Sequence, residues 1–240
     1  MKTKFFSILQ NKFFYLFLLG VFTFSACKKD ADVISTPTSR LMALNLIPDS
    51  TEPVVFVLSN KSITNAPLSF TNYSGTYLPV YSGSRTLGLY KAAGDSALAK
   101  TDFNFMPEKY YSVFALGADG NYKNFITEDY LDSLPSSTGN AFVRYINAIP
   151  DSTSPIVTIL ANGTTIESGN ASFGKVSNFI GVKPGDVSFT VNNESDISAS
   201  RTISLEKDRI YTVLIMGLPN AIDTAQSIQI KYISNGTITP

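Results

Sequence analysis

The heptapeptide Ile47-Pro48-Asp49-Ser50-Thr51-Glu52-Pro53 returns, 102 residues later, as Ile149-Pro150-Asp151-Ser152-Thr153-Ser154-Pro155. A second pair of matching segments follows in the same order, with Glu108–Gly117 recurring as Asp208–Gly217. Two matches in the same order, each roughly a hundred residues apart, indicate an internal duplication. The 240 residues therefore predict two copies of one domain, at residues 40–135 and 140–240, joined through the turn-rich segment 135–139.

Within each copy, apolar and polar residues alternate as they do in half-buried β-strands. Val187, Phe189 and Val191, for example, are separated by single polar residues, which places them on one face of a strand. Asn162-Gly163 and Asp119-Gly120 fit two-residue hairpin turns, because both central positions of such turns need positive φ. The pattern predicts about seven short strands per copy and an all-β fold of two tandem antiparallel β-sandwiches.

The composition argues against several classes of function. The chain has 19 basic and 19 acidic residues, no His, no Trp and one Cys. Lys2, Lys4 and Lys12 fall within the first 26 residues, which hold no acid, so the remainder has 16 basic and 19 acidic residues, a net charge of −3. We therefore expect no nucleic-acid partner. Without His, and with a single Cys, we also expect no disulfide, no metal site and no cofactor.

Residues 1–26 predict a lipoprotein signal peptide. The three lysines form a basic start, and an apolar run over residues 13–24 follows. This run of about a dozen residues is shorter than the roughly 20 that a membrane-spanning helix needs. A secretion signal is therefore favoured over a permanent transmembrane helix.

The apolar run ends in Phe24-Ser25-Ala26-Cys27, which resembles the lipobox of bacterial lipoproteins, with Phe24 replacing the usual Leu as in the Bacteroidota type. The resemblance implies a diacylglycerol on the Cys27 sulfur and fatty acids such as palmitate, each buried methylene adding about 0.8 kcal/mol to membrane binding. We expect an outer membrane lipoprotein with a flexible tether over residues 27–39, facing the cell surface rather than the periplasm. The alternative is a free, buried cysteine in an N-terminal helix.

The second copy carries the clearest family resemblance. Its run Val143–Asp151, the apolar strand Ile156–Leu160 and Asn162-Gly163 resemble the family described as domain of unknown function 4397 (DUF4397), over residues 40–135 and 140–235. Copy one departs at Leu41–Leu44, where the family prefers a Val-Arg-Val type of start. The resemblance implies tandem immunoglobulin-like or transthyretin-like sandwiches on secreted or lipid-anchored bacterial proteins, and it implies no particular activity.

Tyrosines are concentrated in copy one and its tail, which hold eight of them against three in copy two. Aromatic side chains bind sugars and partner proteins, and tyrosine is ordered at low entropic cost. Tyr73, Tyr77 and Tyr81 are the candidate ligand contacts. The alternative is packing on half-buried strands, where tyrosine is a preferred residue.

Two further motifs have competing interpretations. The repeated Pro-Asp-Ser-Thr segments fit a ligand loop or a fold-defining turn, and the acidic segment 128–132 fits a calcium site or, more simply, a solvated linker.

Five triplets resemble the O-glycosylation acceptors of exported Bacteroidota proteins. Each consists of an Asp, then a Ser or Thr, then a small or aliphatic residue. The candidate acceptors are Ser50, Ser96, Ser133, Ser152 and Thr224.

Together these features predict a non-enzymatic, lipid-anchored cell-envelope protein that binds or adheres to a protein or glycan partner, with copy one making the contact. No Gly-x-Ser-x-Gly or Walker-type loop is present in the sequence. Two alternatives remain: an inert structural spacer of the cell surface, and a hydrolase whose carboxylates converge from distant strands.

The intact mass of natively produced protein tests both modifications at once. We expect a mass equal to the polypeptide from Cys27 onward plus lipid plus one or more glycans. A mass equal to the polypeptide plus lipid alone would exclude the glycans.

Overall fold

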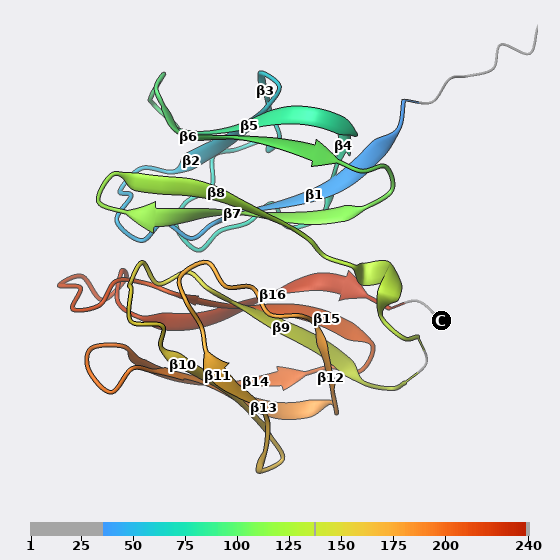
Figure 1. The fold of residues 1–240 in the computed structure, drawn as a ribbon, viewed down its shortest axis with the longest axis vertical. Helices are drawn as coiled ribbons and strands as arrows, with labels where there is room; N and C mark the ends of the chain where they lie inside the picture. Colours follow the sequence, from blue (N-terminus) through green and yellow to red (C-terminus); the bar gives the residue numbers. More distant parts are fainter. Residues whose placement is uncertain (1–35, 137, 239–240) are drawn as a thin grey trace, which may run out of the picture. The chain divides into compact units, whose positions relative to one another are not determined.

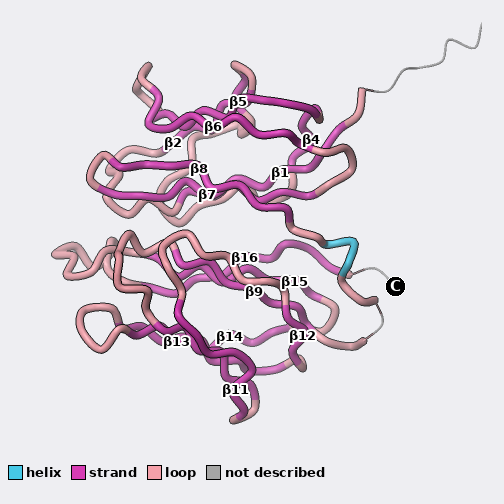
Figure 2. Tube along the Cα trace, in the orientation of Figure 1, coloured by secondary structure: helices cyan, strands magenta, loops and turns pink. Residues whose placement is uncertain are grey.

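The computed structural model describes residues 36–238 apart from residue 137, so Cys27 and the predicted signal peptide lie outside the described residues. Repeat 1 contains the strands β1 (Thr38–Asn45), β2 (Val54–Leu58), β3 (Lys61–Ser62), β4 (Leu78–Tyr81), β5 (Gly83–Lys91), β6 (Ala97–Phe105), β7 (Tyr110–Ala118) and β8 (Asn121–Glu128). Repeat 2 contains β9 (Ala141–Asn147), β10 (Ile156–Ala161), β11 (Thr164–Asn170), β12 (Ile180–Val182), β13 (Gly185–Asn192), β14 (Ser198–Leu205), β15 (Arg209–Met216) and β16 (Gln229–Thr237). A short 3₁₀ turn, η2 (Leu131–Ser133), lies between the repeats (Figure 2).

Each repeat is a sandwich of two four-stranded sheets, which confirms the predicted all-β tandem fold. The sheet orders are β4-β1-β7-β8 and β3-β2-β5-β6 in repeat 1, and β12-β9-β15-β16 and β11-β10-β13-β14 in repeat 2. The first and seventh strands of each repeat pair in parallel. In an immunoglobulin sandwich the first two strands share a sheet, whereas here they lie in different sheets, so the transthyretin-like alternative fits. No helix in the described part of the chain is long and apolar enough to cross a membrane.

Local sequence explains several turns. Asp119-Gly120 and Asn162-Gly163 adopt positive φ at both positions, as predicted for two-residue hairpins. Ser59-Asn60, which the sequence did not mark as a turn, adopts the same conformation with φ of 47° and 67°. All three turns connect consecutive antiparallel strands, whose register they help to fix.

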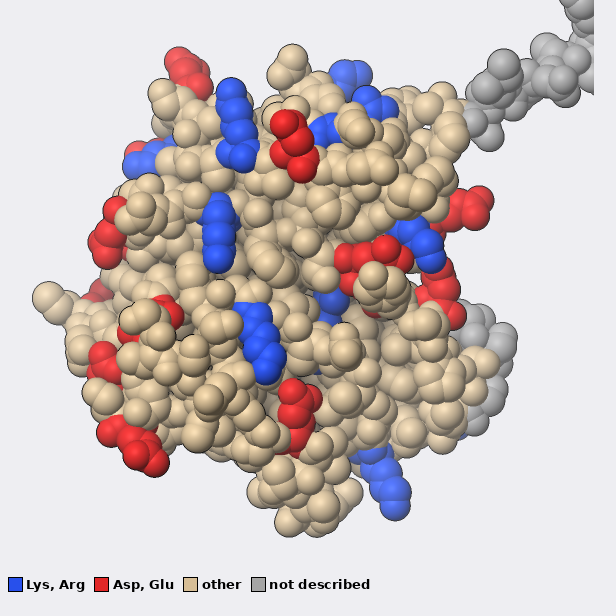
Figure 3. Space-filling model, in the orientation of Figure 1, with Lys and Arg blue, Asp and Glu red and all other residues tan. Residues whose placement is uncertain are grey.

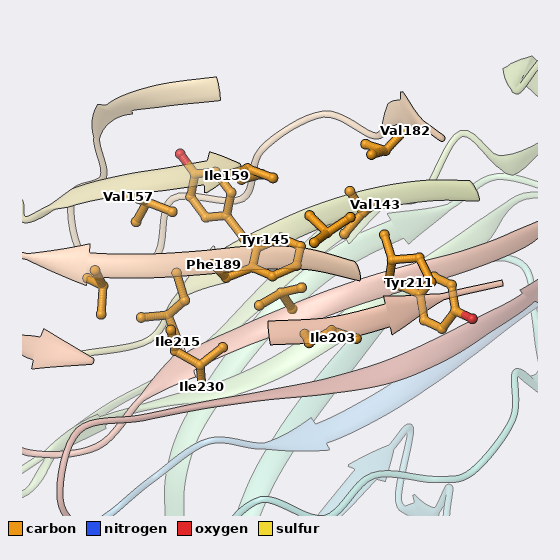
Figure 4. Close-up of a cluster of buried hydrophobic side chains, with 14 of the residues drawn as sticks. Val143, Tyr145, Val157, Ile159, Val182, Phe189, Ile203, Tyr211, Ile215 and Ile230 are labelled. Atoms are coloured by element: carbon orange, nitrogen blue, oxygen red, sulfur yellow. The ribbon is translucent and has the colours of Figure 1, made fainter. Parts of the chain in front are cut away.

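Each sandwich has its own hydrophobic core between its two sheets. In repeat 2, Val187, Phe189 and Val191 of β13 are buried in one cluster with Val157 and Ile159 of β10. Figure 4 shows part of this core, with Phe189, Val157 and Ile159 among the labelled side chains. Full burial of such a side chain contributes about 1.5–3 kcal/mol. The predicted alternation on β13 is therefore confirmed.

A third hydrophobic cluster joins the two repeats, and Figure 1 shows the result as four stacked layers. On β7, Val113 and Ala115 face the core of repeat 1 while Phe114 and Leu116 face repeat 2. The cluster consists of buried side chains from both repeats: Met42, Leu44, Leu46, Tyr77, Phe114, Leu116, Ile146, Ala148, Leu214, Met216 and Ile233. The central strands of the two inner sheets, β1, β7, β9 and β15, are therefore buried on both faces over most of their length.

A buried ion pair lies beside this third cluster. Arg144 of β9 and Asp129, just after β8, are 2% and 0% exposed, with Arg144 Nη2 lying 2.7 Å from Asp129 Oδ1. The contact lacks hydrogen-bond geometry, so it is an ion pair without a hydrogen bond. Asp129 Oδ2 accepts hydrogen bonds from the hydroxyls of Ser112, at 2.7 Å, and Tyr77.

The polar network continues into repeat 2. Arg144 donates from Nε to Thr212 Oγ1 at 3.0 Å, and Thr212 donates to Asn235 Oδ1 at 2.6 Å. Asn235 Nδ2 in turn donates to the Tyr77 hydroxyl at 2.9 Å. Asp129 is thus a buried member of the inter-repeat contact, and its interpretation as part of a solvated linker was wrong.

Removing the carboxylate of Asp129 tests this network. Asp129→Asn should lower the free energy of unfolding by about 3 kcal/mol or more, because the buried Arg144 charge is left uncompensated. Lys109→Met is the control, since Lys109 makes only exposed ion pairs with Glu128 and Asp132, both at 3.6 Å. Urea denaturation midpoints provide the measurement, and equal midpoints for the two variants would contradict the network's role.

Candidate functional site

A groove of about 610 Å³ lies at one end of repeat 1. It opens between the edge strands β3 and β4, which belong to the two opposite sheets. Its floor is aliphatic, formed by Leu58, Ile63 and Val80. Cationic and aromatic side chains form its rim.

Repeat 2 shows why the groove exists, because the same position there is filled. Arg85 of β5 pairs with Phe103, and Val187 of β13 pairs with Ile203 at the equivalent register. Val187 is fully buried in the core of repeat 2, whereas Arg85 is half-buried. In repeat 1 an arginine thus stands at the strand position that a core valine holds in repeat 2.

The neighbouring hairpin is also shorter in repeat 1. In repeat 2, Ala161 at the end of β10 pairs with Val187 and covers it. In repeat 1, β2 ends at Leu58, which pairs with Leu87, so β2 offers no partner to Arg85. The shorter hairpin and the arginine together leave the end of the sandwich open.

Arg85 is held at the rim by the backbone of the preceding turn. Its Nη2 and Nε donate to the carbonyl oxygens of Ser82 and Tyr81, at 3.1 and 3.3 Å. Its guanidinium carbon lies 6.0 Å from the centroid of the Tyr81 ring, which is 58% exposed. With the exposed Lys61 on β3, and with no acidic residue in the lining, the rim is positively charged.

The structure separates the three tyrosines predicted to contact a ligand. Tyr81 lies at the groove, whereas Tyr77 is buried between the repeats, with its ring 5.1 Å from that of Tyr110. Burial, and then the charge of Asp129, raise the pKa of the Tyr77 hydroxyl. Tyr73 is half-buried and packs against the third cluster. The three side chains therefore do not form one exposed platform.

The repeated Pro-Asp-Ser-Thr segments form turns. Asp49 Oδ2 accepts from the backbone N–H of Asp119 at 2.7 Å and from the Tyr122 hydroxyl at 3.1 Å. In repeat 2, Asp151 Oδ1 instead accepts from the N–H of Thr153 at 2.6 Å. Asp49 thus ties its turn to the β7–β8 hairpin of the same repeat, and Asp151 closes its own turn, which supports the turn interpretation.

The residue that fixes each of these segments is a buried asparagine two positions before the isoleucine. Asn45 donates to the carbonyl of Leu68 at 2.9 Å and accepts from the N–H of Ile47 at 3.0 Å. Asn147 makes the corresponding bonds, at 2.7 and 3.1 Å, with Ala171 and Ile149. The sequence argument missed them, although their recurrence 102 residues apart was a usable signal.

A second repeated polar contact closes the turn before β7 and before β15. The backbone N–H groups of Met106 and Glu206 donate to the hydroxyls of Tyr111 and Tyr211, both at 3.1 Å. Such a tyrosine corner ties a strand to the turn that precedes it. These two tyrosines therefore have a structural role.

The five candidate glycosylation acceptors lie on loops, and four of them lie at one end of the molecule. Ser50, Ser96, Ser152 and Thr224 are in connections at the end where β1 and β9 finish, opposite the groove. Ser133 lies on η2. All are exposed except Ser50, which is half-buried and donates to the carbonyl of Glu52 at 2.6 Å.

A cavity of about 540 Å³ at the same end bears on the hydrolase alternative, because Asp119 and Asp151 both line it. Asp119 is exposed, and Asp151 is held in its own turn by Thr153. Catalytic carboxylates are commonly separated in pKa by burial or by close charges. This pair has no buried member, so its surroundings favour a structural role.

Charges on the surface are otherwise mixed. Figure 3 shows Lys and Arg interspersed with Asp and Glu over the face drawn. Among the described residues, no group of three or more His, Cys, Asp or Glu could hold a metal ion. The groove rim is therefore a local concentration of positive charge.

Comparison with known proteins identifies a family. The family model Domain of unknown function (DUF4397) matches residues 39–154 and again residues 141–235. No curated protein matches the chain.

Two solved structures are similar over most of their length. A "putative cell adhesion protein" from Bacteroides eggerthii DSM 20697 is 8% identical, with 84% of this chain and 96% of that chain covered and a TM-score of 0.28. A family 41 carbohydrate-binding module from streptococcal virulence factors, described for alpha-glucan recognition, is 10% identical, with 76% and 94% covered and a TM-score of 0.25. At such TM-scores neither likeness carries an argument about this chain.

Proposed function

This chain belongs to the DUF4397 family in two tandem copies, and we propose that it is a non-enzymatic module of the bacterial cell envelope that binds a partner protein. The groove of repeat 1 is the observation that carries the proposal. Its aliphatic floor and positively charged rim fit a polypeptide segment with an aliphatic side chain beside a carboxylate. An inert spacer would need neither an open groove nor an arginine in place of a core valine.

The rim residues are of the types that contribute most to protein interfaces. Tyrosine and arginine are enriched among the side chains whose truncation costs the most binding energy. Arg85 is already oriented by two backbone carbonyls, so little further ordering is needed when a partner binds. Tyr81 adds a large apolar surface next to that charge.

A polypeptide fits the groove better than the glycan that the sequence left as an alternative. The floor residues Leu58, Ile63 and Val80 offer no side-chain hydrogen bond to sugar hydroxyls, which would lose their bonds to water on entering. An aliphatic side chain loses nothing of this kind and gains by burial.

We further propose that lipid on Cys27 holds this module at the outer membrane, facing the cell surface. Thr38 lines the groove, so about a dozen residues connect the groove to the anchor. Such a segment spans at most about 40 Å. The glycans proposed for Ser50, Ser96 and Ser152 would then cover the opposite end.

Reversing the charge of Arg85 tests the groove. Arg85→Glu and Tyr81→Ala should each weaken binding of acidic, aliphatic peptides selected on the wild-type protein by at least about tenfold. Lys183→Glu is the matched control, because Lys183 is an exposed cation just after β12, the counterpart of β4 in repeat 2. Fluorescence polarisation with labelled peptides provides the measurement. The proposal fails if Arg85→Glu and Lys183→Glu have the same effect on peptide binding. It also fails if the wild-type protein binds glycans on an array but selects no peptides.

Replacing Cys27 tests the anchor. Cys27→Ala should abolish incorporation of an alkyne-labelled fatty acid and shift the protein from the outer membrane fraction to the soluble fraction, since no acyl chains remain to be buried. Labelled protein from cells that express the wild type or the variant is compared after fractionation. A variant that stays labelled and sediments with membranes would contradict the anchor.

A further inference from the structure

The loop between β15 and β16 exposes an aliphatic side chain at its tip. Ile222 has a relative exposure of 103%, the highest among the large apolar side chains described. The equivalent connection in repeat 1 is the tight turn Asp119-Gly120. The two repeats therefore differ in this loop as well as in the groove.

The loop is ordered by hydrogen bonds within it and to the connection between β13 and β14. The N–H of Ala225 donates to Asp223 Oδ1 at 2.9 Å, and Asn220 Nδ2 donates to Asp196 Oδ2 at 3.2 Å. The exposed tip thus presents Ile222 and the carboxylate of Asp223 side by side, in a segment without a basic residue. Because the tip is preorganised, its binding costs little conformational entropy.

This tip complements the groove of repeat 1. The aliphatic floor would bury Ile222, and the positive rim formed by Arg85 and Lys61 would face Asp223. The same molecule cannot make the contact, because the groove lies where β1 begins and the loop lies where β15 ends, at opposite ends of the molecule (Figure 1).

We propose that the groove of repeat 1 receives the β15–β16 loop of a second copy of this chain. The inference rests on the proposed function and names its partner protein. The two contacting surfaces differ, so the association is heterologous and extends head to tail. A row of such copies would have a free groove at one end and a free loop at the other.

A disulfide trap tests the geometry in the full chain with Cys27→Ala, which leaves no other cysteine. Tyr81→Cys and Ile222→Cys are introduced together, and the protein is oxidised without reductant and analysed by denaturing electrophoresis. We expect a ladder of covalent multimers, because each copy can link at both ends. The matched control pairs Tyr81→Cys with Ile156→Cys, another exposed isoleucine of repeat 2. A ladder no stronger than that of the control would overturn the proposal.

A charge exchange tests the chemistry. Arg85→Glu and Asp223→Arg should each weaken self-association by at least about tenfold in sedimentation experiments. The two changes in one chain should restore it, since the opposite charges again face each other. Failure of the double variant to exceed either single variant would overturn the pairing of these two residues. Protein lacking glycans is used, because a glycan on Thr224 would cover the loop.

A loop exchange separates this inference from the proposed function. Replacing residues 218–226 with the Ala118-Asp119-Gly120 turn of repeat 1 should abolish self-association and leave the binding of acidic peptides unchanged. If acidic peptides bind while the parent chain stays monomeric, this inference fails and the proposed function stands. If neither self-association nor peptide binding occurs, both fail.

Discussion

Strands β1, β7, β9 and β15 are buried on both of their faces over most of their length, and this double burial shapes the rest of the molecule. One face of each strand fills the core of its own sandwich, and the other fills the cluster between the repeats. Parallel strands buried on both sides need nearly continuous apolar runs. The sandwiches consequently form one compact unit, and the buried pair of Arg144 and Asp129 adds a polar contact at its edge.

Within this frame the duplication provides an internal comparison. The buried asparagines and the tyrosine corners recur in both repeats, as expected for contacts that the fold requires. The outer ends have diverged, because the groove of repeat 1 is filled in repeat 2 and the short turn of repeat 1 is a longer loop in repeat 2. The repeats thus differ at positions that lie outside the packing contacts shared by both sandwiches. Loops on a rigid scaffold commonly carry function.

The sequence predicted what depends on local pattern. Alternation on β13 and the Asp119-Gly120 turn are properties of neighbouring residues. The groove could not be predicted in this way, because it depends on β2 ending before it reaches Arg85. Burial of Asp129 depends likewise on a partner in the other repeat. The run Val113–Leu116 is apolar on both faces, and this signal could have indicated the contact between the sandwiches.

Rigid coupling of the repeats fixes the groove of repeat 1 and the β15–β16 loop of repeat 2 at opposite ends of the molecule. The groove belongs to the end where β1 begins, and the exposed loop belongs to the other end, in the other repeat. Because the two sandwiches pack through a large apolar cluster, the orientation of one feature relative to the other is fixed rather than set by a flexible linker. A fixed orientation allows the same rotation to be repeated from copy to copy, which produces either a closed ring or an extended row. If each copy carries the lipid proposed for Cys27, the segment of at most about 40 Å between anchor and groove would keep every copy close to the bilayer, so a row would lie along the membrane.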